Sequence, residues 1–312
     1  MIERSIKWVI ARFTLEQRAH MRLTILIILA LIPFASLQAA TAPTKPTKIP
    51  PIAPRIVPKK AAIPPKDPHS TYQHITVKVA QGTFPIDVVT LDRGAYDLIT
   101  DTADATDCAK DCKAKKLTDY LTVNKAAIGI HGSYFCPPDY KQCQDVLNSY
   151  HWPVFNSRLN SMINADNIKY HEGPMMIVTA DGNYTYLHRA YDLGHSIKDI
   201  EIRLGSSITA AIANYPSLVE GGKVIADKEE RLKETNLTRK GPRGAIGFND
   251  KKVMIVIAQK ATVLDLAYIM KSLGVTNAMN LDGGGSVALA YDSKYRVGPG
   301  RLLPNAIVFR KK

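Results

Sequence analysis

A run of three glycines between an acidic residue and a serine, Asp282-Gly-Gly-Gly-Ser286, is the segment of this sequence best suited to bind an anion. Glycines let backbone N–H groups approach a ligand closely, and N–H groups arranged in this way hold phosphate or sulfate oxygens. The segment is not a P-loop, because no Gly-Lys-Ser/Thr follows, and Ser286 lacks the Gly-x-Ser-x-Gly context of a nucleophile elbow. Taken alone, such glycines more often form a tight turn than a ligand site.

Three further side chains could take part in chemistry, and each has a plainer alternative. Arg243, in Gly-Pro-Arg-Gly, could clamp a phosphate through two parallel hydrogen bonds, or be an exposed loop arginine. Glu220 lies at a turn between apolar segments, where it could be an acid, a base or a solvated turn carboxylate, and alone the last is favoured. His131 follows an apolar strand and could bind a ligand, transfer protons or form a hydrogen-bonded wall.

The elements that must position these residues follow from the hydrophobic pattern. Alternating or continuous apolar runs predict strands at 73–79, 84–91, 126–130, 208–213 and 253–258. Residues 174–187 contain two apolar runs around Asp181-Gly182, which predicts a β-hairpin. Residues 108–121 are polar and rich in lysine, and predict a short helix or an insertion constrained by disulfides, followed by a surface loop over 136–152.

A strand–helix–strand unit is predicted near the C-terminus. Thr262, with Asp265 three residues later, is typical of a capping box at a helix start, and Gly274 is expected to end that helix. The strand at 277–281 then leads directly into Asp282. We therefore expect a single α/β or α+β domain over residues 72–312, with a mixed β-sheet and this C-terminal unit.

The N-terminal residues have the composition of a targeting segment and a linker. Residues 23–37 form a short apolar run after Arg22 and before small residues, which predicts a signal peptide or an N-terminal anchor within residues 1–40. Residues 41–71 are rich in proline and lysine and predict an extended linker. The expected location is therefore outside the cytoplasm: periplasmic, secreted or tethered to a membrane.

The net charge of +13 is unevenly distributed, since residues 1–68 carry +8 and residues 69–312 only +5. A nucleic-acid binder is expected to carry its excess charge on the folded domain, so this distribution argues against nucleic acid as a partner. The basic N-terminal segment could instead associate with a membrane or envelope surface. The mildly basic folded part suits an anionic ligand.

The four cysteines form two pairs by spacing, Cys108 with Cys112 and Cys136 with Cys143. Four cysteines allow three disulfide connectivities, of which we favour the sequential one. A zinc site is the alternative, but the C-x3-C and C-x6-C spacings match the C-x2-C ligand pairs of zinc sites poorly. We therefore expect disulfides in an oxidising compartment, and we assign no metal or cofactor.

Together, five segments resemble the phosphodiester glycosidases, a family whose members cleave sugar phosphodiesters. The resembling segments are AIGIHGSYF at 127–135, PSLVEGGKVI at 216–225, GPRGAIGF at 241–248, the helix and NLDGGGS within 265–286, and RLLPNAIV at 301–308. They occur in the family's order and span residues 75–310, and the NLDGGGS element with its preceding helix is the most specific. Three positions depart from the family pattern: His131 replaces Asn, Gly244 replaces Thr, and Gln259-Lys260 replaces Asp-Gly.

The resemblance implies a glycosidase that acts on a sugar-1-phosphodiester, such as an N-acetylglucosamine-1-phosphodiester in an envelope or extracellular glycan. Asp282 would be the nucleophile or the stabiliser of the cationic anomeric carbon, and Glu220 a second carboxylate. Arg243 would bind the phosphate, and His131 the sugar or the phosphate. The expected substrate-binding residues are Gly132, Tyr134, Gly283, Gly284, Gly285, Ser286 and Asn305. The alternative is a non-catalytic binder of anionic glycans that keeps the fold, an alternative that the three departures favour.

Overall fold

The computed structural model describes residues 67–228 and 235–312, which form three β-sheets with antiparallel neighbouring strands and a few helices. The first sheet has the order β1 (Ser70–Val79), β2 (Gly82–Asp92), β13 (Lys252–Ala261), β12 (Gly241–Phe248), β14 (Asn277–Gly283), β10 (Ser217–Glu220) and β11 (Lys223–Val224). The second has the order β16 (Lys294–Val297), β15 (Leu289–Tyr291), β4 (Ile128–His131), β17 (Asn305–Lys311) and β3 (Tyr96–Thr102). The third has the order β6 (Ser161–Ile163), β5 (Val154–Asn156), β9 (Ile208–Ala213), β7 (Met175–Thr179) and β8 (Tyr184–Leu187).

The helices are short. They are α1 (Leu117–Val123), α2 (Ile197–Leu204), α3 (Thr235–Thr238) and α4 (Val263–Ser272), with 3-10 turns η3 (Lys141–Cys143), η4 (Ala165–Tyr170), η5 (Ala226–Lys228) and η7 (Gly284–Ser286). The expected combination of strands and helices in an α+β arrangement is confirmed, but in place of the expected mixed sheet the described strands form three sheets whose neighbours pair antiparallel. In the described part of the chain, no helix has the length and apolar character to cross a membrane.

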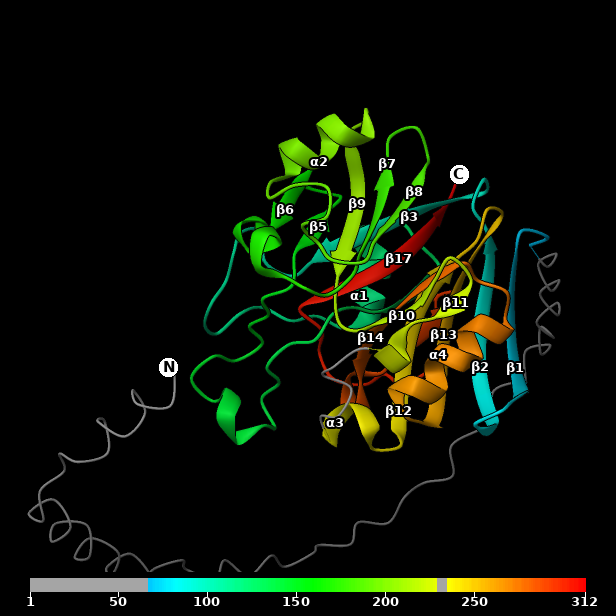
Figure 1. The fold of residues 1–312 in the computed structure, drawn as a ribbon. Coiled ribbons are helices and arrows are strands. Elements are labelled where there is room, and N and C mark those ends of the chain that lie inside the picture. Colours follow the sequence, from blue (N-terminus) through cyan, green and yellow to red (C-terminus); the bar gives the residue numbers. More distant parts are fainter. Residues whose placement is uncertain (1–66, 229–234) are drawn as a thin grey trace, which may run out of the picture. The chain divides into compact units, whose positions relative to one another are not determined.

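The central strands of the first sheet are buried on both faces, which explains their continuous apolar runs. In β13, Ile255 and Ile257 contact the core shared by the three sheets, whereas Val256 and Ala258 contact the cluster beside α4. Successive side chains of a strand point to opposite faces, so both sets need apolar residues. Figure 1 shows α4 lying along this sheet.

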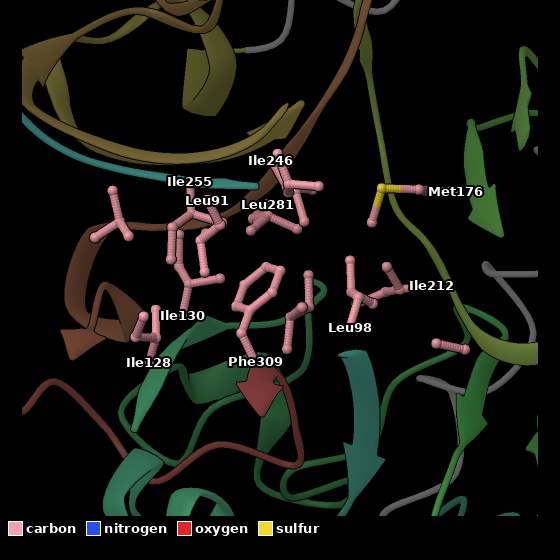
Figure 2. Close-up of a cluster of buried hydrophobic side chains, with 14 of the residues drawn as sticks. Leu91, Leu98, Ile128, Ile130, Met176, Ile212, Ile246, Ile255, Leu281 and Phe309 are labelled. Carbon is pink, nitrogen blue, oxygen red and sulfur yellow. The ribbon is translucent and has the colours of Figure 1, made fainter. Parts of the chain in front are cut away.

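The main core lies between the three sheets (Figure 2). Its labelled side chains include Leu91, Ile246, Ile255 and Leu281 from the first sheet, Leu98, Ile130 and Phe309 from the second, and Met176 and Ile212 from the third. Ile130 and Leu281 are both fully buried, one residue before His131 and one before Asp282. The core therefore holds the ends of β4 and β14 next to each other.

The local predictions near the site are confirmed. Thr262 Oγ1 accepts the Asp265 N–H at 3.0 Å and Asp265 Oδ2 accepts the Thr262 N–H at 2.8 Å, which is the predicted capping box. Gly274 follows α4 with a φ of +81°, a conformation that favours glycine. β7 and β8 pair as the predicted hairpin. β13, α4 and β14 follow one another in the chain in the predicted order. In the sheet, β12 lies between β13 and β14.

The predicted signal peptide or anchor at 1–40 lies outside the described residues, as does the linker at 41–71 except for its last five positions. There, β1 already begins at Ser70, slightly before the expected start of the folded part. Both cysteine pairs are disulfides with the sequential connectivity that we favoured, with S–S distances of 2.15 Å for Cys108–Cys112 and 1.98 Å for Cys136–Cys143.

Candidate active site

Asp282 lies where the end of β14 meets the end of β4. Its backbone N–H donates to the Gly132 carbonyl at 3.0 Å, which ties the first sheet to the second at this point. On the other side, Gly283 pairs with Arg243 in the β12–β14 register. The sequence segments that resembled the family at 127–135, 241–248 and 265–286 therefore meet at one place in the fold.

A cavity of about 400 Å³ opens above this junction. Its cationic lining residues are Arg239, Lys240, Arg243 and Arg301, and its aromatic ones are Tyr134, Phe135, Tyr140, Trp152 and Tyr215. Among the residues that the structure describes, Asp282 is the one carboxylate in this lining. A cavity of this size, with one acid among several cations and aromatic rings, suits a small anionic ligand with an apolar face.

The Asp282 carboxyl is partly buried, and burial is the largest cause that raises its pKa, to about 6. Four interactions oppose this shift: hydrogen bonds from Ser286 and from the Gly283 N–H, the latter at 2.7 Å, and the charges of Arg301 and Arg243. At neutral pH the carboxylate is therefore ionised but poorly solvated. Such a group is poised to stabilise a positive charge or to act as a nucleophile.

The three glycines follow Asp282 as the end of β14 and the turn η7. Gly284 has a φ of +61°, which favours glycine, and Gly284 and Gly285 are exposed. A Cβ on Gly285 would lie 2.8 Å from Cζ of Arg301, so this glycine permits the close approach of the guanidinium. Of the predicted ligand-binding glycines, Gly283 and Gly284 line the cavity directly.

His131 is fully buried and is absent from the described cavity lining. Its Nε2 lies 2.8 Å from the Asp282 carbonyl oxygen, and its Nδ1 lies 3.2 Å from the Ala288 oxygen and 3.3 Å from the Ala288 nitrogen. Burial lowers the pKa of this imidazole, so one ring nitrogen carries the proton. We assign that proton to Nε2, whose contact is the shortest, and Nδ1 then accepts the Ala288 N–H. Neutral His131 thus connects the two ends of the glycine turn from behind the site, outside the described cavity lining where a ligand contact was expected.

The departures from the family pattern at 131 and 244 are structurally linked. A Cβ on Gly244 would lie 2.3 Å from Cε1 and 2.4 Å from Nε2 of His131, closer than real Cβ contacts. The imidazole therefore occupies the space that a side chain at 244 would need. A smaller residue at 131 would leave room for a larger one at 244, so both departures are compatible with an intact site. Gln259 lies at the end of β13, outside the described cavity lining.

Arg243 lines the cavity, but protein carbonyls occupy much of its guanidinium. Nε donates to the Ala261 oxygen at 3.2 Å, and Nη2 donates to the Asn236 and Arg239 oxygens at 2.5 and 2.6 Å. Nη1 is the nitrogen nearest Gly283. The expected bidentate clamp is therefore not available through Nε and Nη2. Through these bonds Arg243 holds the segment around α3 as a cavity wall, and its Nη1 lies near Gly283.

Glu220 is not brought to Asp282. In the β10–β14 pairing Val219 lies opposite Ala278, so Glu220 is next to Asn277, at the other end of β14 from Asp282. Five residues of extended strand correspond to about 17 Å. Glu220 Oε2 instead lies 3.1 Å from His188 Nδ1. The prediction of Glu220 as a second carboxylate in this site does not fit the structure.

Several predicted substrate-binding residues support the site from behind it. Asn305 is buried, and its Oδ1 accepts the Ser133 N–H at 2.9 Å. A Cβ on Gly132 would lie 1.8 Å from that same Oδ1, so Gly132 is required by Asn305. Ser286 is buried beneath Arg301. Tyr134 does line the cavity, and its hydroxyl accepts a hydrogen bond from Asn280 Nδ2 at 2.6 Å.

The sequence reasoning missed Arg301 and the aromatic wall as site residues. Arg301 Nη1 donates to Ser286 Oγ at 3.2 Å, Nη2 pairs with Asp139, and the Arg301 backbone N–H donates to the Gly285 oxygen at 2.9 Å. Its place at the start of the segment RLLPNAIV was the available signal. Trp152 stacks on His171 with ring centroids 4.5 Å apart, but nothing in its surrounding sequence indicated a cavity.

The described residues offer one group with metal-ligand spacing, Asp104 with Cys108 and Cys112. Both of its sulfur atoms are engaged in the Cys108–Cys112 disulfide, so this group does not fit a zinc site. The group also does not belong to the described lining of the Asp282 cavity.

Residues 126–310 match the model of the phosphodiester glycosidase family. The fold is similar to the catalytic domain of zebrafish N-acetylglucosamine-1-phosphodiester alpha-N-acetylglucosaminidase auto-inhibited by its pro-peptide, with a TM-score of 0.58, 13% identity, and coverage of 78% of this chain and 83% of that one. It is also similar to a hypothetical protein from Synechocystis, with a TM-score of 0.54, 15% identity and coverage of 78% of this chain.

This chain spans 62% of the Synechocystis protein's length. At these identities, the structural similarities show a shared fold. The comparison with curated proteins gives no significant match. The family match covers more than half of the chain and includes every residue that lines the described cavity, so this chain belongs to the phosphodiester glycosidase family.

Proposed function

We propose that this protein is an exported glycosidase that hydrolyses a sugar-1-phosphodiester of an envelope or extracellular glycan, with Asp282 as its catalytic carboxylate. The observation that carries the proposal is the partly buried Asp282 carboxyl, with its raised pKa, among the cationic and aromatic residues of the cavity. The zebrafish relative is an N-acetylglucosamine-1-phosphodiester glycosidase by its description, so an N-acetylglucosamine-like sugar is the first substrate to test.

The chemistry of the bond explains how one carboxylate can suffice. Cleavage of the bond between the anomeric carbon and the phosphate oxygen leaves the electron pair on a phosphomonoester, and water supplies the hydroxyl group of the released sugar. A phosphomonoester is a stable anion, so its departure needs less general-acid assistance than an alcohol would. The remaining requirement is stabilisation of positive charge at the anomeric carbon, which Asp282 supplies from the cavity floor.

The phosphate would bind beside the glycine turn. Arg301 lies against Gly285, and Arg243 Nη1 lies near Gly283. The Gly283 N–H already donates to Asp282, so the exposed Gly284 and Gly285 would supply the N–H dipoles of the turn. Together these groups place positive charge where the departing phosphate gains negative charge. The aromatic side chains Tyr134, Trp152 and Tyr215 would pack on the apolar face of the sugar.

Export is supported by two kinds of observation. Both cysteine pairs are oxidised in the structure, and disulfides persist mainly in oxidising compartments. The apolar run at 23–37 has the length and flanks of an export signal. A carbohydrate or glycan phosphodiester outside the cytoplasm is the partner that both the compartment and the cavity suit.

A non-catalytic binder of anionic glycans is the second candidate. It is favoured by the position of Glu220, which leaves Asp282 as the sole carboxylate in the described lining, whereas most glycosidases use two. A binder would retain affinity for a sugar phosphate without turnover.

The test is a sugar-release assay on a panel of synthetic phosphodiesters that differ in sugar and anomer, each with and without a chelator. Release of both the free sugar and the phosphomonoester supports the glycosidase. Saturable binding of N-acetylglucosamine 1-phosphate without release from any member of the panel would support the binder instead. The chelator arm determines whether a metal ion contributes.

A further inference from the structure

The loop between Cys136 and Cys143 is fixed at the rim of the cavity. The disulfide joins its two ends, and inside it the Tyr140 N–H donates to the Pro137 oxygen at 3.2 Å and the Cys143 N–H to the Tyr140 oxygen at 2.9 Å. Its first residue is anchored to the body, because the Cys136 N–H donates to the Ser149 oxygen at 2.9 Å. A short loop with so many constraints presents its side chains in a defined place.

Two side chains of this loop hold Arg301. The Asp139 carboxylate accepts a hydrogen bond from Arg301 Nη2, and the Tyr140 ring centroid lies 5.2 Å from its Cζ. The Arg301 side chain is only 20% exposed while that of Asp139 is 55% exposed, so the loop covers the arginine from the solvent side. On its inner side Arg301 donates to Ser286 and lies against Gly285.

The position of Arg301 matters because it contacts the glycine turn and its charge acts on Asp282. A long arginine side chain has many rotamers, and fixing it costs conformational entropy unless neighbours hold it in place. Here the inner contacts come from the turn and the outer ones from the disulfide loop. Without the outer contacts the guanidinium would be free to leave the turn for solvent.

We propose that the disulfide-closed loop Cys136–Cys143 is a positioning element for phosphate recognition: Asp139 and Tyr140 hold Arg301 over the Gly283–Gly285 turn. The proposal rests on the proposed function in that Arg301 is taken to bind the substrate phosphate. Asp139 and the disulfide act through Arg301 and do not contact the ligand. Reduction of this disulfide would therefore weaken binding of the phosphate without affecting the sugar pocket.

The test measures binding and turnover separately. Calorimetry gives the dissociation constants of N-acetylglucosamine 1-phosphate, inorganic phosphate and free N-acetylglucosamine for the oxidised full chain and its variants. The variants are Asp139→Asn, Asp139→Glu and the double variant Cys136→Ser/Cys143→Ser. The matched controls are Asp97→Asn, which breaks the Asp97–Arg310 ion pair between β3 and β17, and Cys108→Ser/Cys112→Ser, which opens the other disulfide.

We expect Asp139→Asn and the double serine variant to weaken phosphate and sugar-phosphate binding by about tenfold or more, the order of one charge-assisted hydrogen bond. Asp139→Glu should recover most of the affinity, and binding of the free sugar and both controls should match wild type. In turnover, kcat/KM for the phosphodiester should fall, through a higher KM because the bound phosphate loses a partner and through a lower kcat because the departing phosphate loses the charge of Arg301. Melting curves establish that each variant is folded, and the Asp139 variants test the idea even if the serine variant does not fold.

Unchanged phosphate affinity in Asp139→Asn would overturn the proposal, and so would tighter binding, which would mean that Asp139 competes with the ligand for Arg301. A wild-type chain that binds neither phosphate probe would overturn it as well. If the wild-type chain binds the sugar phosphate in a loop-dependent way but hydrolyses no phosphodiester, the glycosidase proposal fails and the role of the loop stands.

Discussion

Replacing Gly244 by alanine tests the contact that holds Asp282 in place, and the test does not depend on knowing the substrate. The new Cβ would lie 2.3 Å from Cε1 and 2.4 Å from Nε2 of His131, so one of the two groups must move by roughly 1 Å to restore ordinary contact. Gly244 has no positive φ, and the backbone itself accepts alanine. The whole effect therefore reports on the imidazole.

The imidazole cannot move without losing its hydrogen bonds. His131 has no exposed surface, and its Nε2 lies 2.8 Å from the Asp282 oxygen. Overpacking a core costs about 1–3 kcal/mol, and a buried carbonyl left unpaired costs about 1–3 kcal/mol more. We expect Gly244→Ala to lower the free energy of unfolding by about 2–6 kcal/mol, which for a domain of this size lowers the Tm by about 4–24 °C.

The assay is a thermal or urea unfolding curve for a double-mutant cycle. The matched control is Gly241→Ala in the same strand, where a Cβ would have no neighbour within 4 Å, and its unfolding free energy should change by less than about 1 kcal/mol. His131→Asn should relieve the Gly244→Ala substitution, with a favourable coupling of about 0.5–3 kcal/mol. The same reasoning predicts that His131→Asn/Gly244→Thr is more stable than Gly244→Thr alone. Additive effects of the two substitutions would refute the linkage between the two positions.

Further predictions concern the charged groups and the cysteines. The pKa of Asp282 is raised to about 6 in the folded chain, so its protonation favours folding below about pH 4, and this contribution is lost as the pH rises to about 6. Between these pH values the free energy of unfolding of Asp282→Asn should rise by up to about 3 kcal/mol relative to that of wild type, as measured by unfolding curves at each pH. If the ionised carboxylate is required, kcat/KM should rise with pH through about 6, whereas a profile that is flat from pH 5 to 7 would contradict this. Arg243→Lys cannot reproduce the donors to Asn236 and Arg239, and should lower kcat/KM by about tenfold to a hundredfold, measured by steady-state kinetics; wild-type values would show that the guanidinium is dispensable. Thiol labelling of the denatured, unreduced chain should detect no free cysteine, and four labelled thiols would contradict both disulfides.

The local elements were predictable because their signals are short in sequence. The capping box of Thr262 and Asp265 and the turn at Asp181-Gly182 each lie within a few residues, so propensity and pattern suffice. The proximity of Asp282 to Arg243 was inferred from the resemblance to a family. The structure shows its cause in the β12–β14 register, which joins residues about forty positions apart.

The errors in the site have the same origin in non-local pairing. The sequence around Glu220 does not indicate that β10 pairs antiparallel with β14, with Val219 opposite Ala278. This register separates the carboxylates of Glu220 and Asp282. Arg301 meets Asp139 across more than 160 residues, and although the Cys136–Cys143 pairing was favoured correctly, nothing in the sequence placed its loop beside Arg301. His131 was a candidate ligand contact until its burial and its two hydrogen bonds placed it behind the site.

The most direct test of the central claim compares wild type with Asp282→Asn on an N-acetylglucosamine-1-phosphodiester, with turnover and substrate affinity measured on the same preparations. We predict that wild type releases the sugar and the phosphomonoester, and that Asp282→Asn loses at least about 10²–10³ in kcat while its substrate dissociation constant changes little, since the carboxylate acts mainly on the transition state. Equal turnover by the two proteins, or a wild type that binds the phosphodiester without cleaving it, would contradict the assignment of Asp282 as a catalytic carboxylate.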